Sequence, residues 1–379
     1  MNDKDLHAHL IGRQGGRASF NTPVLVIELD VLKANIARMA GFAKANLMAL
    51  RPHAKTHKSS DIARLQVEAG AVGVCCAKIG EAEAIADGRG ADSILITSPV
   101  VTPQAIERLV ALNGRLPDLR VAVDHPDNVA AIAHAMKAQA KKLNLLVDVD
   151  PGIRRTGVGS PEAAVALAKA IKAEPQLAYL GVQFYCGREQ HTASFEERKK
   201  QVGQRFAYLR TVLDALQTAG FPAQVVTGGG TGTHVIDASV GVLNELQAGS
   251  YVFMDKQYLD CDIQGGDGEP FPTSLFIDAS VVSANTPGMA TLDSGFKSMS
   301  TDGGSPAIHA GAPADAKFFF MGDEHGAVLA PGSQFKPGDR VVLTAPHCDP
   351  TVNLYDWYHV VRGDTLVDIW PVSARGRSR

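Results

Sequence analysis

The sequence predicts an α/β fold, a (β/α)8 barrel, followed by a second, C-terminal all-β domain. Short apolar runs alternate with Ala-rich segments of helical period over the first two thirds of the chain, and this alternation stops near residue 260. Strands that alternate with helices form a parallel sheet. Eight such units in roughly 200 residues fit a closed barrel better than an open sheet of five or six strands.

The elements follow from the period of the apolar residues. The first predicted strand is 24–30, and a helix follows it with Leu32, Ile36, Met39, Phe42 and Ala43 on one face. Eight further strands are predicted at 47–52, 72–76, 93–97, 120–123, 143–149, 179–185, 224–227 and 244–248. Helices are predicted between most of them, at 60–69, 80–88, 102–113, 126–141, 161–173 and 195–219.

After residue 260 the predicted elements are strands. They lie at 274–284, 316–322, 339–345 and 357–363, and turns rich in Gly, Pro and Asp separate them. We therefore expect three parts: an N-terminal arm at 1–22, a barrel at 23–260 and a β domain at 261–379.

Composition excludes several classes of protein. The chain of 379 residues has 37 basic and 40 acidic side chains and a net charge of −3, so no basic excess indicates a nucleic-acid partner. No apolar run approaches the roughly 20 residues that a membrane helix needs. The first residues lack the apolar core of a signal peptide. Five cysteines are too few for a disulfide framework, which favours the cytoplasm.

The barrel predicts where to look for the site, because barrel active sites lie at the C-terminal ends of the strands. The glycine-rich run TGGGTGT (227–233) follows one predicted strand, and 249–251 follow the next. Backbone N–H groups on such adjacent loops commonly bind phosphate. Two tight turns with no ligand are the alternative.

Lys55 follows the first barrel strand and lies between His53 and His57. Neighbouring cations and apolar strand ends both lower the pKa of an amine, and an amine that is free at neutral pH can form a Schiff base. The alternative is a solvated loop lysine. A Schiff-base lysine together with a phosphate site is the minimal description of a pyridoxal phosphate site.

A third feature is the segment 347–357 in the β domain. In an extended segment His347 and Asp349 point to the same side and Cys348 points away. One imidazole and one carboxylate suit a divalent metal ion with open positions. The alternative is a hydrogen-bonded turn before Pro350.

Five motifs together resemble the D-threonine aldolase family of the alanine-racemase-like, fold-type III pyridoxal phosphate enzymes, which is related to D-serine dehydratase. They are RPHAKTHKS, DVDPGIRRTGV, TGGGTGT, LQAGSYVFMD and HCDPTVNLYDWY, and they occur in family order. The resemblance covers the chain from about residue 20 to the end. It implies a homodimer with an N-terminal barrel and a C-terminal β domain.

The resemblance also implies roles for individual residues. Lys55 is then the Schiff-base lysine, and the phosphate contacts are Thr231, Gly232, Gly249, Ser250 and Tyr251. Arg155 lies near the phenolic oxygen of the cofactor, and Tyr185 lies against its ring. Gln247 replaces the racemase arginine that faces the pyridine nitrogen, a departure compatible with a neutral ring. His347 and Asp349 are the metal pair, with Mn²⁺ as the expected ion and Mg²⁺, Co²⁺ or Zn²⁺ as alternatives.

The implied reaction is the retro-aldol cleavage of D-threonine and other D-β-hydroxy-α-amino acids to glycine and an aldehyde. The metal ion lowers the pKa of the β-hydroxyl, and a base removes its proton. His191 is the candidate base; a capping or surface histidine is the alternative. Rival functions are a D-serine or 3-hydroxy-D-aspartate dehydratase, an amino-acid racemase, and a non-catalytic pyridoxal phosphate carrier.

Overall fold

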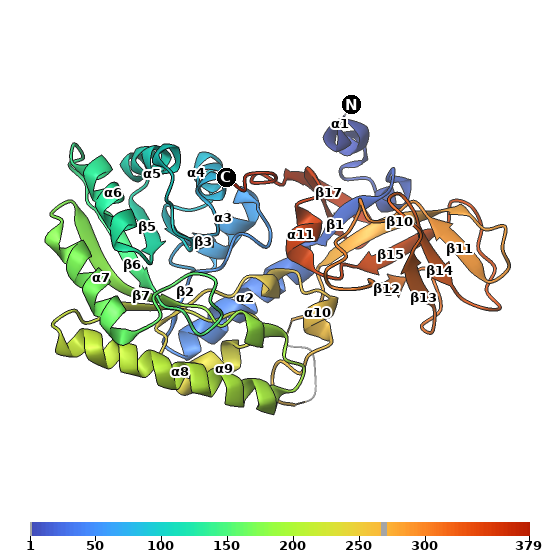
Figure 1. Cartoon of the computed structure of the whole chain (residues 1–379). Coiled ribbons are helices and arrows are strands. Elements are labelled where there is room, and N and C mark those ends of the chain that lie inside the picture. Colours follow the sequence, from blue (N-terminus) through green and yellow to red (C-terminus); the bar gives the residue numbers. More distant parts are fainter. Residues whose placement is uncertain (1, 267–270) are drawn as a thin grey trace.

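In the computed structural model, which describes residues 2–266 and 271–379, a barrel and a strand-rich domain lie side by side (Figure 1). The barrel sheet has eight parallel strands in the order β2-β9-β8-β7-β6-β5-β4-β3. Their bounds are β2 Ala49–Leu50, β3 Val74–Cys76, β4 Ser93–Ile96, β5 Asp118–Val123, β6 Leu143–Asp148, β7 Leu177–Phe184, β8 Val225–Gly228 and β9 Glu245–Leu246. All eight predicted barrel strands are therefore confirmed.

The sheet closes between its two outer strands. An isolated parallel bridge joins His53 to Cys75. Beside it, the N–H of Val72 donates to the carbonyl of Leu50 at 2.9 Å, and the N–H of Cys75 donates to the carbonyl of Pro52 at 2.8 Å. These bonds satisfy the backbone groups that an open edge would leave unpaired.

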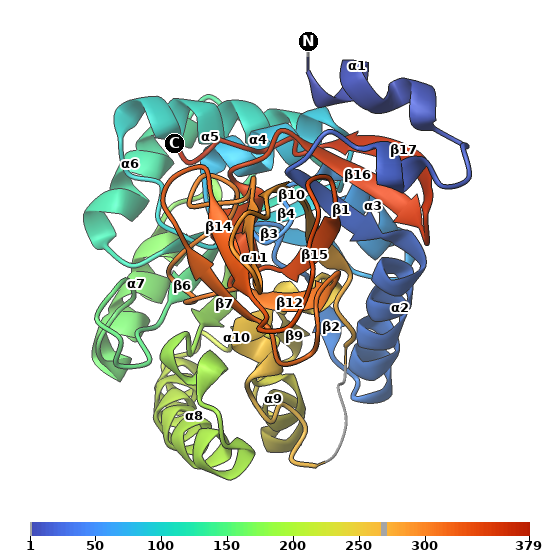
Figure 2. The same cartoon turned by 90° about the vertical axis from the view of Figure 1, so that its right-hand side faces the viewer.

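Helices surround this sheet, as Figure 2 shows from the side of the strand-rich domain. They are α2 Leu29–Ala45, α3 Ser60–Glu68, α4 Ile79–Asp87, α5 Pro103–Arg115, α6 Pro126–Met136, α7 Pro161–Ala173, α8 Phe195–Thr218 and α9 His234–Val240. Each predicted helix is present. The helix predicted to run to residue 141 ends at Met136. The central barrel strands bury nearly all of their side chains, as expected for strands covered on both faces.

The second sheet has nine strands and contains β10 Leu275–Ser283, β11 Met289–Leu292, β12 Ala307–Ala310, β13 Lys317–Phe320, β14 Gly326–Leu329, β15 Arg340–Thr344, β16 Trp357–Arg362 and β17 Thr365–Pro371. The ninth is β1, Val24–Glu28, which lies between β10 and β16. The sequence groups this strand with the barrel that follows it, but its partners are residues about 250 and 330 positions away. The division of the chain at residue 260 stays a prediction.

The N-terminal arm packs on the strand-rich domain. Its helix α1, Asp3–His7, ends at His7, whose Nδ1 lies 2.7 Å from Nε2 of His359 in β16. Phe20 packs against both imidazole rings. In the part of the chain that the structure describes, no helix is long and apolar enough to cross a membrane.

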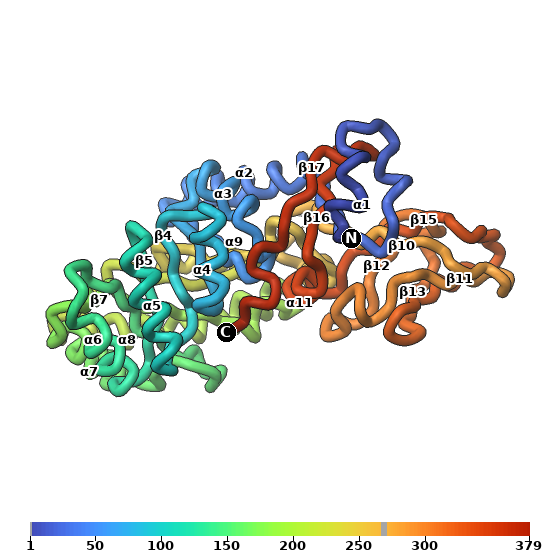
Figure 3. Tube along the Cα trace, turned by 90° about the horizontal axis from the view of Figure 1, so that it is seen from above, coloured from blue at the N-terminus to red at the C-terminus, as the bar shows by residue number. Residues whose placement is uncertain are grey.

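A short helix, α11 Cys348–Val352, lies between the barrel and the second sheet in both Figure 1 and Figure 3. It brings side chains of the C-terminal part of the chain to the rim of the barrel.

Candidate active site

A cavity of about 570 Å³ opens at the C-terminal ends of the barrel strands. Four residues that the sequence analysis singles out line it: Lys55, Arg155, Tyr185 and Gln247. They come from the loops after β2 and β6, from the end of β7 and from the end of β9, so the strand order of the barrel brings them together. This is the end of the barrel at which such enzymes carry their sites.

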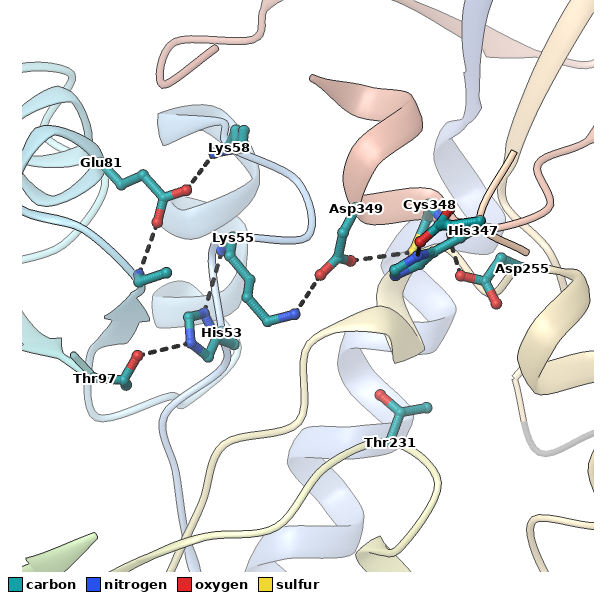
Figure 4. Close-up of polar contacts among 12 residues, drawn as sticks. His53, Lys55, Lys58, Glu81, Thr97, Thr231, Asp255, His347, Cys348 and Asp349 are labelled. Atoms are coloured by element: carbon teal, nitrogen blue, oxygen red, sulfur yellow. Dashed lines mark hydrogen bonds and ion pairs between the residues drawn. The ribbon is translucent and has the colours of Figure 1, made fainter. Parts of the chain in front are cut away.

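Lys55 points from the barrel toward α11, where its Nζ forms an ion pair with the carboxylate of Asp349 (Figure 4). Its backbone N–H donates to Nδ1 of His53 at 3.3 Å. His53 in turn contacts the Thr97 hydroxyl through Nε2 at 3.1 Å. These contacts hold the turn 53–57 against the barrel. The side chain of Lys55 extends from this turn toward the second domain.

The expected fall in the pKa of Lys55 is wrong for the chain without cofactor. Burial lowers the pKa of Lys55, but the charge and hydrogen bond of Asp349, together with Tyr185 and Cys348, outweigh burial, so the pKa lies above its ordinary value. The two histidines do not act as cations, because burial lowers the pKa of His53 well below 6.5 and that of His57 to about 4. The sequence could not reveal Asp349 as the partner, since it lies 294 positions along the chain.

The five predicted phosphate contacts lie together on the loops after β8 and β9. Two of their N–H groups already have partners, because Gly232 donates to Oε1 of Gln190 at 3.1 Å and Tyr251 donates to Oγ1 of Thr231 at 3.0 Å. Among the described residues, no acceptor is recorded for the N–H groups of Thr231 and Gly249. Buried N–H groups are rarely left without a partner, so this pair suits an anionic ligand.

The close approach of the backbone at Gly249 supports the same conclusion. A Cβ at this position would stand 2.7 Å from Oγ1 of Thr56 and 3.1 Å from the carbonyl oxygen of His53. Only glycine therefore fits without displacing the loop that carries Lys55. The residues present fit a phosphate-bearing cofactor whose reactive carbon is within reach of Lys55.

Arg155 and Tyr185 form a second wall of the cavity. The guanidinium carbon of Arg155 lies 5.6 Å from the centre of the Tyr185 ring, which is a cation–π distance. The contact orients the ring beside Lys55. Burial raises the pKa of Tyr185, so its hydroxyl stays protonated at neutral pH.

His191 lies in the 3-10 turn Arg188–His191 after β7. Its ring packs on that of Tyr258, with centroids 4.4 Å apart. Burial, followed by the charge of His347, lowers the pKa of His191 to about 4, so the imidazole is neutral and able to accept a proton. The charge of Asp349 raises the pKa of His191 and that of Lys55 lowers it.

His347 and Asp349 are close, but the segment is not extended. His347 precedes α11 as its N-terminal cap, and Asp349 lies in the first turn of that helix. Two features favour a helix start here. Proline stands at the third helical position, and the N–H of Cys348 donates to Asp255 at 2.8 Å. Cys348 is fully buried, as predicted. In residues 2–266 and 271–379, no group of three or more His, Cys, Asp or Glu side chains is arranged to hold a metal ion.

Sequence reasoning missed two carboxylates that support this segment. Asp302 accepts from Nδ1 of His347 at 2.7 Å. Asp255 accepts from the N–H of Cys348 and, at 3.1 Å, from that of Tyr258. Asp302 lies in a run of turn residues, where nothing in the sequence separates it from a solvated loop aspartate. Asp255 ends the motif LQAGSYVFMD, so its place in that motif was the available signal.

Comparison with known proteins agrees with this geometry. The family model "Alanine racemase, N-terminal domain" matches residues 27–257, and "Putative serine dehydratase domain" matches residues 274–361. D-threonine aldolase from Arthrobacter sp. is 38% identical over 96% of this chain and 94% of its own. The chain belongs to the D-threonine aldolase family of fold-type III pyridoxal phosphate enzymes.

Other members of the family are equally similar. A 3-hydroxy-D-aspartate aldolase from Paracoccus denitrificans (strain Pd 1222) is 40% identical over 95% of this chain and 93% of its own. The crystal structure of D-threonine aldolase from Filomicrobium marinum superimposes with a TM-score of 0.90 at 35% identity, covering 96% of this chain and 97% of that one. The family places the chain among carbon–carbon lyases and implies pyridoxal phosphate as its cofactor. A D-threo-3-hydroxyaspartate dehydratase from Delftia sp. is a more distant relative, at 28% identity over 76% of this chain and 74% of its own.

Proposed function

We propose that this chain cleaves D-threonine and other D-β-hydroxy-α-amino acids to glycine and an aldehyde, with pyridoxal phosphate and one divalent metal ion. The observation that carries the proposal is the position of Lys55, which faces the segment of His347 and Asp349 across one cavity rim. The amine for the cofactor and one carboxylate of the proposed metal pair are thus in direct contact. The relatives named as aldolases support the same reaction.

In the proposed site, Lys55 holds the cofactor, the loops 231–232 and 249–251 hold its phosphate, and Arg155, Tyr185 and Gln247 line its ring. Pyridoxal phosphate supplies an electron sink for the electron pair left on the α-carbon when the bond to the β-carbon breaks. With Lys55 joined to the cofactor, Asp349 would lose the ammonium group with which it pairs. Its carboxylate is then free for a cation.

The metal pair fits a divalent ion in one further respect. When Nδ1 of His347 donates to Asp302, the lone pair on Nε2 is available as a ligand, and a carboxylate behind a ligating imidazole is the common arrangement in metal sites. Mixed nitrogen and oxygen ligands suit Mn²⁺, with Mg²⁺, Co²⁺ or Zn²⁺ as alternatives. A divalent ion at this pair would lower the pKa of the substrate β-hydroxyl.

His191 has the role of general base in this proposal. It is neutral, its pKa responds to the charges of His347 and Asp349, and its ring packs on that of Tyr258. It accepts the proton of the β-hydroxyl as the carbon–carbon bond breaks.

Dehydration is the second candidate, because a dehydratase is among the relatives. The resemblance favours the aldolase, since dehydratases of this class typically carry cysteine where Asp349 stands. Product analysis with D-threonine and with 3-hydroxy-D-aspartate separates the two. We expect glycine and an aldehyde; a 2-oxo acid and ammonia would instead show a dehydratase. Absence of any turnover with metal would favour a cofactor carrier.

We also propose a homodimer. Among the described residues of the C-terminal domain, six large apolar side chains are exposed, namely Val282, Phe296, Phe319, Met321, Leu329 and Leu354. Exposed apolar groups of this kind are typical of interfaces. Light scattering on the holoenzyme should give twice the chain mass of 40.1 kDa; a monomer at assay concentration would contradict the proposal.

A further inference from the structure

A line of side-chain amides runs along the wall of the cavity behind Lys55. At its inner end, Nε2 of Gln183 lies 2.8 Å from the carbonyl oxygen of Thr97 and 2.9 Å from Oδ1 of Asp148. A backbone carbonyl can only accept, so the atom that contacts it must be the amide nitrogen. The orientation of Gln183 is thereby fixed, and its oxygen Oε1 points to the next amide.

That next amide belongs to Gln247. Its Nε2 lies 3.0 Å from the hydroxyl of Thr227 and 3.5 Å from Oε1 of Gln183. Since Oε1 of Gln183 can only accept, the nitrogen of Gln247 faces it and the oxygen of Gln247 faces away. The Thr97 carbonyl thus fixes the orientation of the Gln183 amide, and Gln183 in turn fixes that of the Gln247 amide.

The Gln247 oxygen is an acceptor that the protein itself does not use. Gln247 is 4% exposed and lines the cavity. In the part of the chain that the structure describes, no donor is recorded for its Oε1, and this atom is not among the fully enclosed atoms without a partner. It therefore borders the cavity space, where a ligand that donates a hydrogen bond would satisfy it. Leaving a nearly buried acceptor unpaired is costly, which favours such a ligand.

Two anchors fix how the cofactor ring would lie. Lys55 would join the aldehyde carbon carried by the ring atom opposite the nitrogen, and the phosphate loops would hold the phosphate carried by the neighbouring ring atom. The ring nitrogen therefore lies at the end of the cavity away from the Lys55 amine. Gln247 stands two residues before the phosphate loop residue Gly249, in the position where related racemases have the arginine that faces this nitrogen.

We propose that Gln247 Oε1 accepts a hydrogen bond from the protonated ring nitrogen of the cofactor, so that this chain holds the cofactor as a pyridinium. A racemase arginine can only donate and favours the unprotonated ring. The sequence alone suggested a neutral ring here as well, and the orientation of the two amides reverses that expectation. A protonated ring is the stronger electron sink, which suits a reaction that leaves an electron pair on glycine.

Taken together, the charged side chains of the cavity wall do not exclude a protonated ring nitrogen. Lys78 and Arg155 disfavour a further cation, whereas Asp124 in the wall and Asp148 behind Gln183 favour one. The hydrogen bond to Gln247 is the local interaction that decides between the two forms.

The test is the ¹⁵N chemical shift of labelled pyridoxal phosphate bound to the full chain, recorded without substrate or metal. We expect the upfield shift of a pyridinium nitrogen at neutral pH. Gln247→Leu, which is similar in size and has no acceptor, should lower the ratio of protonated to unprotonated nitrogen at least about tenfold, the effect of one lost hydrogen bond. Gln247→Glu should keep the pyridinium signal to higher pH. Gln217→Leu, on the exposed surface of α8, is the matched control and should match the wild type.

An unprotonated nitrogen in the wild-type holoenzyme would overturn the proposal, and so would a Gln247→Leu variant with an unchanged shift. If Gln247→Leu does not retain the cofactor, the wild-type shift and that of Gln247→Glu still decide. The inference depends on cofactor binding and not on the substrate. A pyridinium signal in a chain that forms no glycine would therefore remove the proposed function and leave this inference standing.

Discussion

Lys55 and Asp349 form an ion pair across the junction of the two domains. The lysine comes from the loop after the first barrel strand, and the aspartate comes from a helix between the barrel and the second sheet. Burial raises the pKa of Asp349. The charges of Lys55 and His347 act in the opposite direction, and the net result is a pKa well below the ordinary value. In the chain without cofactor, the amine and the carboxylate neutralise each other. In the proposed function, cofactor attachment and cation binding would both require this pair to separate.

The first prediction concerns the amine that holds the cofactor. Lys55→Ala should abolish covalent attachment, because Lys55 lines the cavity together with the proposed ring contacts Arg155 and Tyr185. Borohydride reduction of the holoenzyme followed by peptide mapping should place the label on Lys55. Lys297→Ala, at an exposed site on the strand-rich domain, should keep the label. A label on Lys58 or Lys297 in the wild type would refute the assignment.

The second prediction concerns the phosphate loop. Gly249→Val should weaken cofactor affinity at least about tenfold, which is about 1.4 kcal/mol, because the new side chain collides with Thr56 and the His53 carbonyl. Equilibrium dialysis of pyridoxal phosphate measures the change. Gly114→Ala, a helix glycine with open space around it, is the control. Unchanged affinity in Gly249→Val would count against the phosphate site.

A third prediction follows from Asp302, which accepts from His347. Asp302→Asn should raise the metal concentration needed for half-maximal turnover about 10- to 100-fold, since carboxylates behind ligating imidazoles have effects of that size. Excess Mn²⁺ should restore the rate. Asp323→Asn, on the exposed surface, should leave the metal dependence unchanged. Equal metal dependence in Asp302→Asn and the wild type would show that Asp302 has no role in the metal site.

The fourth prediction concerns pH and the N-terminal arm. Nε2 of His7 accepts from the N–H of Asn21 at 2.9 Å, so Nδ1 of His7 carries a proton and donates to Nε2 of His359. Burial lowers the pKa of His7, and burial and the neighbouring His7 lower the pKa of His359 to about 3. Both imidazoles are thus neutral in the folded chain.

The sign of the pH effect follows from these shifts. Between the unfolded histidine pKa of about 6.5 and the lower folded values, the unfolded chain binds more protons. Stability should therefore fall as pH falls below about 6.5. His7→Gln, which removes one of the two groups, should flatten the slope of the melting temperature against pH in this range. A slope equal to that of the wild type would show that the pair does not contribute.

Much of the barrel could be predicted from the sequence, because its strands and helices are set by local period. The sequence could not assign β1 to the second sheet. A short apolar strand carries no information about its partners, and those of β1 lie at the far end of the chain. The strands β11, β12, β14 and β17 were not predicted; the first three have only four residues each, which leaves few positions for an alternating pattern.

The same distinction applies to the site. Lys55, Arg155, Tyr185 and Gln247 could be placed in one cavity because parallel strands end at the same rim. The pKa of Lys55 could not be predicted from the sequence, because it depends on Asp349 from another domain. His347 and Asp349 were found as a pair, but their helical setting depends on Asp255, a tertiary contact.

The most direct test of the account is glycine formation from D-threonine by the holoenzyme, measured together with the visible absorbance of the bound cofactor. We expect glycine and acetaldehyde in equal amounts when Mn²⁺ is present. A chelator, or Asp349→Ala, should abolish glycine formation and leave the cofactor absorbance nearly intact, because Asp349 pairs with the Lys55 amine only in the chain without cofactor, and the proposed phosphate and ring contacts stay unchanged. Full glycine formation in chelated enzyme, or in Asp349→Ala without added metal, would contradict the account.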